Sequence, residues 1–287
     1  MSRITWVAVL TGLRWARRGK RLRKRGTRHT GRSLLTGLVL ALGAWAARAD
    51  LPCVAYEANS LPQSEGWEEH QYGGGADLEL IDGTLVIDGW ASIAISDFFH
   101  QDLTALPGPN QYLRVDWRLR VDQVQGFADP GMQIASPKGS VVLIYQINRV
   151  YSLSDNTWVG YFTPGDFHDY TFISSDMETY SLYIDRTLSY AGEFVGLNYP
   201  PNIEWGDYGQ GAASVSTWDH VRFAVVAPGD VDGDGDIDFN DINPFVAALV
   251  SGTDSGLSPC ALHAADVNQD GAADFGDINP FIDLLMK

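Results

Sequence analysis

The sequence predicts a mostly β protein, in which an antiparallel β-sandwich is followed by a small α-helical domain. Residues 50–227 contain short runs of alternating apolar and polar residues, separated by Gly, Pro, Asp and Asn, with no long helical periodicity. Residues 229–287 contain instead a duplicated segment with apolar residues at helical spacing. Residues 1–49 differ from both parts, because they are basic and end in an apolar stretch.

The strands of residues 50–227 are expected where apolar runs flank turn residues. Leu78–Leu80 and Leu85–Ile87 lie on either side of Asp82-Gly83, a dipeptide that favours a tight hairpin. Tyr112–Val121 alternates strictly, as a half-buried strand does, and Val141–Ile147 is a more continuous apolar run that fits a buried strand. Further strands are expected at Tyr180–Ile184, Leu188–Tyr190 and Trp218–Val226. The spacing predicts about ten strands, which fits an antiparallel sandwich.

Residues 1–49 have the layout of a secretory signal peptide. They hold 12 basic residues and no acidic one, and the apolar stretch Leu34–Ala46 leads into Ala47-Arg48-Ala49, a small-x-small cleavage pattern. We expect cleavage before Asp50 and a mature protein that is secreted or displayed at the cell surface, without a membrane span. The alternative is a retained membrane anchor, because the basic region is unusually long.

The net charge and the number of cysteines argue against two classes of function, nucleic-acid binding and a four-cysteine zinc site. The net charge of −16 becomes −28 once residues 1–49 are removed, because 8 basic residues then stand against 36 acidic ones. Such an acidic chain repels phosphate, which argues against nucleic-acid binding. The sequence contains only two cysteines, Cys53 and Cys260, which is too few for a four-cysteine zinc site. In an oxidising compartment they can form a disulfide, and the alternative is two unpaired thiols.

The duplicated segment has the pattern of two calcium loops. Gly229–Val250 and Ala265–Met286 are identical at 12 of 22 positions, and each opens with D-x-[DN]-x-D-G. Calcium takes six to eight oxygen ligands, and this spacing turns alternate side chains toward the centre of one loop. The predicted ligands of the first loop are Asp230, Asp232, Asp234, the carbonyl of Asp236, Asp238 and Asp241. Those of the second loop are Asp266, Asn268, Asp270, the carbonyl of Ala272, Asp274 and Asp277. We expect tighter binding in the first loop, which offers five side-chain carboxylates against four.

A helix is expected after each loop but not before the first. The apolar stripes that predict these helices are Ile242, Phe245 and Leu249 in one copy, and Ile278, Phe281 and Leu285 in the other. Pro244 and Pro280 fall in the first turn, where the missing N–H costs little. Val225–Gly229, before the first loop, indicates a strand end and a turn.

This duplicated loop and helix resembles the type I dockerin domain. The resemblance covers residues 229–287 and implies two antiparallel loop-helix halves, each EF-hand-like and each holding one calcium ion. It also implies a cohesin-like or other surface protein as the partner, often in assemblies that degrade polysaccharides. The residues that face cohesin in this family are often Ser-Thr, but Phe239-Asn240 and Phe275-Gly276 occupy those positions here.

The middle of the chain resembles the concanavalin-A-like jelly roll of laminin-G and legume-lectin type. Four segments carry the resemblance: His168–Phe172, Tyr180–Asp185, Ile203–Asp207 and Trp218–Phe223. In such domains the hairpin that corresponds to Tyr180–Asp185 has a turn glycine, whereas Arg186 follows here.

The sequence assigns no catalytic residue to the sandwich. The Glu-x-Asp-x-x-Glu pattern of laminarinase-like enzymes is absent. Trp158 and Trp205 lie near predicted turns, and exposed aromatic rings can stack on sugars, so they are the candidate glycan-binding residues. We therefore expect a carbohydrate-binding sandwich with a docking tail, associated with polysaccharide catabolism. The alternatives are a glycoside hydrolase that uses the same tail and a structural cell-envelope protein.

Overall fold

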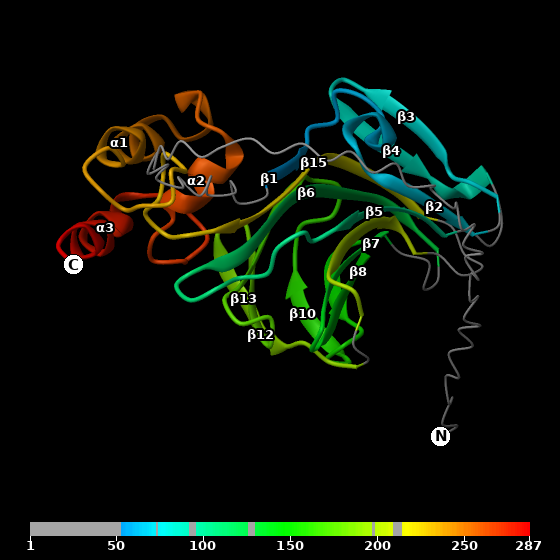
Figure 1. Ribbon diagram of the computed structural model, residues 1–287. Coiled ribbons are helices and arrows are strands. Elements are labelled where there is room, and N and C mark those ends of the chain that lie inside the picture. The colour runs from blue at the N-terminus through cyan, green and yellow to red at the C-terminus, as the bar shows by residue number, and fades with distance from the viewer. Residues whose placement is uncertain (1–52, 73, 92–95, 126–129, 197–198, 209–213) are drawn as a thin grey trace, which may run out of the picture. The chain divides into compact units, whose positions relative to one another are not determined.

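Two antiparallel sheets form a sandwich in the computed structural model, which describes residues 53–287 apart from 73, 92–95, 126–129, 197–198 and 209–213 (Figure 1). The predicted signal peptide lies outside the described residues. The first sheet has eight strands in the described part, in the order β13 (Thr187–Glu193), β12 (Thr179–Ile184), β11 (His168–Ser174), β6 (Tyr112–Val124), β15 (Ser214–Val226), β4 (Thr84–Asp88) and β3 (Asp77–Ile81), with β1 (Cys53–Tyr56) also paired to β15. The second has seven, in the order β10 (Thr157–Tyr161), β9 (Arg149–Ser152), β8 (Gly139–Gln146), β7 (Pro130–Ser136), β14 (Asn202–Asp207), β5 (Ser96–Asp102) and β2 (Glu68–Tyr72).

Strict alternation places one face of each sheet in a shared core. On β6, Leu113, Val115 and Trp117 are fully buried between the sheets, as the pattern of Tyr112–Val121 predicts. On β14 and β15, Trp205 and Trp218 join the same core, with ring centroids 4.9 Å apart. Residues of opposite parity, such as Arg118 and Glu204, lie on the outer faces of the two sheets.

Both hairpins expected from the sequence are present, and the backbone angles of their turns are those of tight hairpin turns. Asp82 and Gly83, between β3 and β4, have φ of 51° and 77°. Asp185 and Arg186, between β12 and β13, have φ of 50° and 62°. Positive φ at both central residues defines the type of hairpin turn whose twist matches that of the flanking strands. Arg186 therefore takes the left-handed conformation that a glycine adopts more easily.

The number of strands is larger than predicted, with fifteen in the described residues against about ten expected. The difference lies mainly in short strands such as β1, β9 and β10, which have only four or five residues each. Runs of that length contain too few alternations to be separated from turns by pattern alone.

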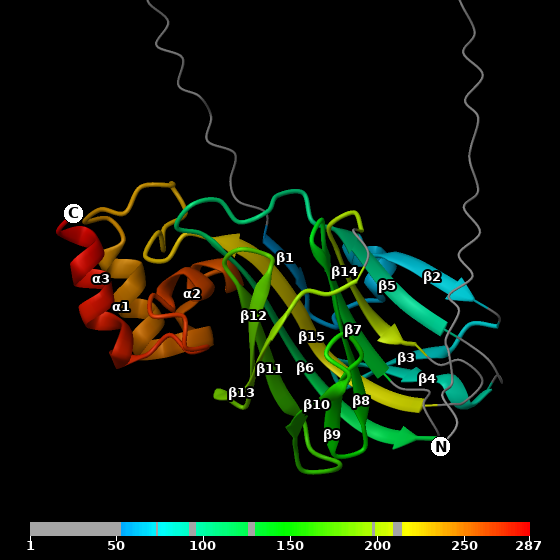
Figure 2. The ribbon, with the colours of Figure 1, turned by 90° about the horizontal axis from the view of Figure 1, so that it is seen from below.

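The C-terminal region contains three short α-helices, α1 (Ile242–Ser251), α2 (Pro259–Ala265) and α3 (Ile278–Leu285). Figure 2 shows α1 and α3 side by side, and the rings of Phe245 and Phe281 stack between them with centroids 4.0 Å apart. Both helices predicted from the apolar stripes are present, and the first residue of each stripe, Ile242 or Ile278, is 36% exposed. Among the described residues, no helix has both the length and the apolar character needed to cross a membrane.

Helix α2, directly before the second loop, was not expected. Ser258 begins it, and its hydroxyl accepts a hydrogen bond from the N–H of Ala261, followed by Pro259 at the first helical position. Both are ordinary helix-start signals. The first loop follows β15 and a turn, as predicted, so the two copies differ in what precedes them. Short 3-10 turns complete the chain at Pro62–Glu65, Gly89–Ala91, Gly252–Ser255 and Phe275–Asp277.

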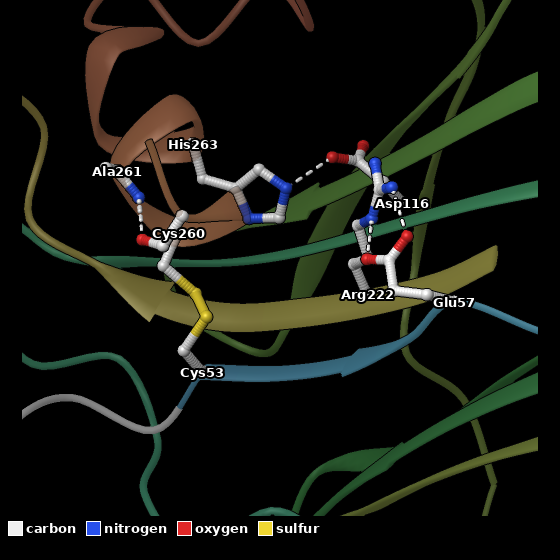
Figure 3. The surroundings of a disulfide bond; sticks show 8 residues. Cys53, Glu57, Asp116, Arg222, Cys260, Ala261 and His263 are labelled. Atoms are coloured by element: carbon white, nitrogen blue, oxygen red, sulfur yellow. Dashed lines mark hydrogen bonds and ion pairs between the residues drawn. A yellow bond between two sulfur atoms is a disulfide. The ribbon is translucent and has the colours of Figure 1, made fainter. Parts of the chain in front are cut away.

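Cys53 and Cys260 form a disulfide, which settles the pairing that the sequence left open (Figure 3). The bond joins β1 to α2, with the two Cα atoms 5.9 Å apart. The sandwich and the loop-helix pair belong to one compact unit.

Candidate functional site

Three carboxylates converge in the first loop, as the motif predicts. Asp230, Asp232 and Asp234 each place one carboxylate oxygen within 4.8 Å of the other two. Gly233 and Gly235 have φ of 76° and 89°, so the loop turns sharply where the sequence places glycine. The N–H of Gly235 donates to Asp230 Oδ1 over 3.2 Å, which fixes the first carboxylate across the loop.

Asp241 closes the first loop from inside. It is fully buried, and its Oδ1 accepts the N–H groups of Val231 and Asp232 over 2.7 and 3.0 Å. Its Oδ2 accepts the N–H of Asp238 over 2.9 Å. The side chain of Asp238 is used differently, because its Oδ1 accepts the N–H of Asn240, two residues before α1 begins. The structure thus brings together the carboxylates at loop positions 1, 3 and 5, whereas the carboxylates at positions 9 and 12 accept backbone N–H groups of the loop.

The electrostatics of the first loop suit a hard cation. Burial raises the pKa of Asp230, and the negative charges of Asp241, Asp232 and Asp234 raise it further, partly offset by the N–H of Gly235. A bound divalent cation would relieve this repulsion. A cleft of about 520 Å³ borders the three carboxylates and gives access from solvent.

The second loop repeats this geometry with one difference at its first residue. Asp266 is fully buried, and its Oδ1 accepts the N–H of Asp270 over 3.1 Å. Its Oδ2 accepts the N–H of Gly271 over 3.0 Å and the guanidinium Nη1 of Arg114 over 2.5 Å. Burial raises the pKa of Asp266 to about 6, although Arg114 acts in the opposite direction.

The rest of the second loop follows the first. Asp277 is buried and accepts the N–H groups of Asn268 and Asp274, each over 2.8 Å. Asp274 caps the 3-10 turn Phe275–Asp277 by accepting the N–H of Gly276 over 2.7 Å. The carbonyl ligands predicted at Asp236 and Ala272 stay predictions.

The second loop and α2 pack against the outer face of the eight-stranded sheet. The hydroxyl of Tyr112 donates to the carbonyl of His263 over 2.5 Å, and that of Tyr183 donates to the carbonyl of Gln269 over 3.1 Å. His263 Nε2 lies 2.6 Å from Asp116 Oδ2, a contact visible in Figure 3. Burial alone would raise the pKa of Asp116, but the charge of Arg114 and the hydrogen bond with His263 hold it well below its usual range.

Large apolar side chains are exposed at equivalent positions of the two copies. Phe239 and Phe275, at loop position 10, are 78% and 74% exposed. Val246 and Ile282, one turn into the helices, are 50% and 49% exposed. Apolar groups that repeat in this way on a small domain are typical of a surface that contacts another protein.

A polar group lies on the outer face of the seven-stranded sheet. His100 on β5 and Glu204 on β14 stand opposite each other, with His100 Nδ1 2.9 Å from Glu204 Oε1. The other histidine nitrogen, Nε2, lies 3.1 Å from Asp102 Oδ1, and Gln133 on β7 donates to Glu204 Oε2 over 3.0 Å. Burial alone would lower the pKa of His100, but the hydrogen bonds to Glu204 and Asp102 outweigh it and raise this pKa.

Aromatic rings adjoin this polar group. The ring of His70 stacks on that of His100, with centroids 5.2 Å apart and planes 9° from parallel. Next to them, Phe98 and Tyr208 stack with centroids 5.4 Å apart. Hydrogen-bonding groups beside flat apolar rings are the two elements from which proteins build sugar-binding surfaces.

Of the two tryptophans predicted to bind glycans, Trp205 is not available. It is fully buried, and its ring packs against those of Tyr56, Trp67, Phe99 and Trp218. The prediction was wrong because Trp205 shares the parity of Ile203, which is also buried in the core. Trp158 is half-buried, and the guanidinium of Arg149 lies 3.7 Å from its ring centroid. Its glycan-binding role stays a prediction.

Arg114, His100 and Glu204 are the functional candidates that the sequence did not reveal. Alternation alone places each on an outer face, because their neighbours Val115, Phe99 and Trp205 are buried. The contacts that give them a role join residues 71 to 152 positions apart, which no local motif records.

No family model matches the chain. No curated protein matches it significantly either. Similar solved structures include a carbohydrate esterase from the Shiga toxin-encoding bacteriophage phi24B, at 11% identity and a TM-score of 0.47, covering 61% of this chain and 99% of its own. A β-1,3-1,4-glucanase (lichenase) from a mouse hindgut metagenome covers 61% of this chain and 99% of its own, at 15% identity and a TM-score of 0.43. The β-glucanase of Bacillus licheniformis covers 60% and 97%, at 11% identity and a TM-score of 0.41. With identities of 15% or less and TM-scores of 0.47 or less, these likenesses carry no argument about activity.

Proposed function

We propose that this chain is an exported calcium-binding protein whose loop-helix pair docks onto a partner protein and whose sandwich binds a polysaccharide. The observation that carries the proposal is the convergence of Asp230, Asp232 and Asp234 in the first loop. Calcium prefers carboxylate oxygens on a flexible, glycine-turned loop, which is what this segment offers. When bound, the ion supplies charge neutralisation and cross-links the loop.

The docking part of the proposal rests on the duplicated exposed residues. Phe239 and Phe275 occupy the positions that face cohesin in the type I dockerin domains that this region resembles. Their exposure supports an apolar partner surface in place of the Ser-Thr pair of that family. A cohesin-like protein with an apolar binding face is therefore the proposed partner class.

The disulfide supports the proposed export. Structural disulfides form and persist in oxidising compartments, and Cys53 lies just after the predicted cleavage site. The mature protein would then be secreted or held at the cell surface through its partner.

The sandwich part of the proposal rests on the outer face of the seven-stranded sheet. His100, Glu204 and Gln133 present hydrogen-bonding groups there, beside the stacked rings of Phe98 and Tyr208. We favour binding over hydrolysis because both oxygens of Glu204 are already engaged, one by His100 and one by Gln133. A retaining glycosidase needs instead two carboxyl groups about 5 Å apart that are free to act on the sugar.

Calorimetry with calcium tests the first part. We expect binding to the wild type and loss of that binding in Asp232→Asn/Asp234→Asn. The matched control is Asp176→Asn, an aspartate in a sandwich turn that hydrogen-bonds Thr179 and lies outside both loops. Calcium binding that survives the double change would refute the assignment.

Docking is tested by surface plasmon resonance against purified cohesin modules, with calcium and with chelator. We expect calcium-dependent binding that falls at least about tenfold in Phe239→Ser/Phe275→Ser, as for exposed aromatic anchors elsewhere. Binding that is unaffected by both the chelator and the substitutions would contradict a dockerin-like role.

A polysaccharide screen, with analysis of released reducing sugars, separates the remaining alternatives. Binding without release, lost in His100→Ala/Glu204→Gln, supports the proposal. Sugar release that disappears in the same variant would establish the glycoside hydrolase instead. Absence of both would favour the structural cell-envelope alternative.

A further inference from the structure

Arg114 joins the second loop to the sandwich through buried contacts. Its Nη1 donates to Asp266 Oδ2 over 2.5 Å, and its Nη2 donates to the carbonyl of Gly271 over 3.0 Å. Its Nε donates to both oxygens of Asp116 over 2.9 and 3.1 Å. The Arg114 side chain is 9% exposed and that of Asp266 is fully buried, so this ion pair is shielded from water.

The first loop has no equivalent cation in the described part of the chain. Asp230, which corresponds to Asp266, accepts an N–H of its own loop, from Gly235, and faces Asp232 and Asp234. Asp266 accepts two N–H groups and the guanidinium, so both of its oxygens are engaged. The two copies therefore differ in how the charge of their first ligand is balanced.

The second loop is also held in shape by strands of the sandwich. The ring of Tyr183 lies so close to Gly271 that a Cβ there would be 3.2 Å from it, and the hydroxyl donates to the carbonyl of Gln269. The hydroxyl of Tyr112 reaches the carbonyl of Asp266 over 3.2 Å. These contacts hold three residues of the loop, Asp266, Gln269 and Gly271, against the sandwich.

A cation that took Asp266 as a ligand would compete with a buried guanidinium. A buried charge is tolerated only while it is paired, and weakening one partner leaves the other unpaired away from water. The same cation would also stand close to a like charge. The second loop therefore does not fit the role that its motif implies.

We propose that Arg114 of the sandwich takes the place of a calcium ion in the second loop, so that the chain binds one calcium and not two. The second loop is then folded without metal, as a fixed part of the sandwich, and the first loop alone responds to calcium. This inference rests on the proposed function only for the calcium in the first loop.

The stoichiometry of calcium is the first test. Native mass spectrometry and calorimetry of the full mature protein should show one equivalent, lost in Asp232→Asn/Asp234→Asn and retained in Asp270→Asn. Two equivalents of similar affinity, or loss of one equivalent on Asp270→Asn, would overturn the inference.

Hydrogen–deuterium exchange in chelator is the second test, and it does not depend on any bound metal. Amides of residues 266–277 should exchange at least about tenfold more slowly than those of residues 230–241, and calcium should slow only the first loop. Equal exchange in the two loops would overturn the inference. If no calcium binds at all, the proposed function fails for the first loop, while this comparison still decides the role of Arg114.

The third test substitutes the guanidinium. Arg114→Gln should remove the protection of residues 266–277 in chelator and allow a second calcium to bind. Arg118→Gln is the matched control, because Arg118 lies on the same face of β6 but is 41% exposed and touches neither loop. Should Arg114→Gln fail to fold, Arg114→Lys can replace it, because lysine keeps the positive charge but loses the planar set of N–H donors. The amides of the second loop in Arg114→Lys should then exchange faster than those of the wild type. Unchanged exchange in a folded Arg114 variant would overturn the inference.

Discussion

Two histidines show how neighbouring groups decide the charge of a side chain. His100 lies between Glu204 and Asp102, with the ring of His70 stacked on it, and its pKa is raised because the carboxylates outweigh burial. The buried His263 contacts the carboxylate of Asp116, and its pKa is lowered because burial dominates and Arg114 and Arg222 add to it. The first is therefore suited to carry a proton near neutral pH, and the second to remain neutral.

The first prediction concerns the pH dependence of His100. Because its pKa in the folded state lies above the unfolded value of about 6.5, protonated His100 stabilises the fold at pH values below 6.5. This contribution is lost as the pH rises through the folded pKa. Urea unfolding should therefore show that His100→Gln is more destabilising at pH 5.5 than at pH 8.5. A difference that is equal at both pH values, or larger at pH 8.5, would contradict the assignment.

The second prediction contrasts the two tryptophans. Trp205→Ala should lower the free energy of unfolding by about 3–5 kcal/mol, because it empties a large volume in the centre of the core. Trp158→Ala should cost about 1 kcal/mol, the scale of its contact with Arg149. Chemical denaturation of both variants checks this, and equal losses would show that burial does not separate them.

This contrast also shows which properties of single residues could be predicted from the sequence and which could not. The convergence of Asp230, Asp232 and Asp234 could be predicted because these residues lie close together in one loop. The burial of Trp205 follows from its alternation with Ile203, although its nearness to a predicted turn suggested exposure. The partners of Glu204 and Asp266 come from distant strands, and no local pattern predicts such contacts.

The outward side chains of strand β6 lie in two different environments, one under the C-terminal region and one in solvent. Its inward side chains fill the core from Leu113 to Val121, as its alternation predicts. Its outward side chains begin under the C-terminal region, at Arg114 and Asp116, and end in solvent near Arg118 and Arg120. The same polar alternation therefore encodes an interface at one end and a solvated surface at the other, which the pattern alone does not distinguish.

The third prediction concerns the close approach of β14 and β5. Gly206 has φ of 137°, and a Cβ there would lie 2.5 Å from the backbone oxygen of Asp97. Gly206→Ala should therefore cost about 2–4 kcal/mol, from backbone strain and a clash that no side-chain rotation relieves. Gly165→Ala is the control, because Gly165 has φ of 81° but open space around it, and should cost about 1 kcal/mol. Thermal unfolding of both variants measures the difference, and equal costs would argue against the clash.

At the scale of the whole molecule, the loop-helix pair is bound to the sandwich by three kinds of contact. They are the disulfide, the side-chain contacts of Arg114 with Asp266 and of His263 with Asp116, and the hydrogen bonds of the Tyr112 and Tyr183 hydroxyl groups. The sequence predicted the sandwich and the loop-helix pair separately, and it left the cysteine pairing open. Their attachment could not be predicted, because it depends on which outer face of the sandwich the second loop meets.

The fourth prediction measures the covalent part of this attachment. Cys53→Ser/Cys260→Ser should lower the free energy of unfolding by about 2–5 kcal/mol, because the bond restricts a long loop of the unfolded chain. Cys53→Ser alone should cost about the same, since either change breaks the bond. If the double variant is as stable as the oxidised wild type, the disulfide does not stabilise the fold.

The same bond sets an order of events during synthesis. Cys260 is made 207 residues after Cys53, and β1 takes its place against β15, which is also made late. At ordinary translation rates this leaves Cys53 without its partner for about 10–40 s. Since the chain has two cysteines, no wrong bond can form within it. Errors of oxidation must therefore join one chain to another, and their frequency should rise with the level of expression.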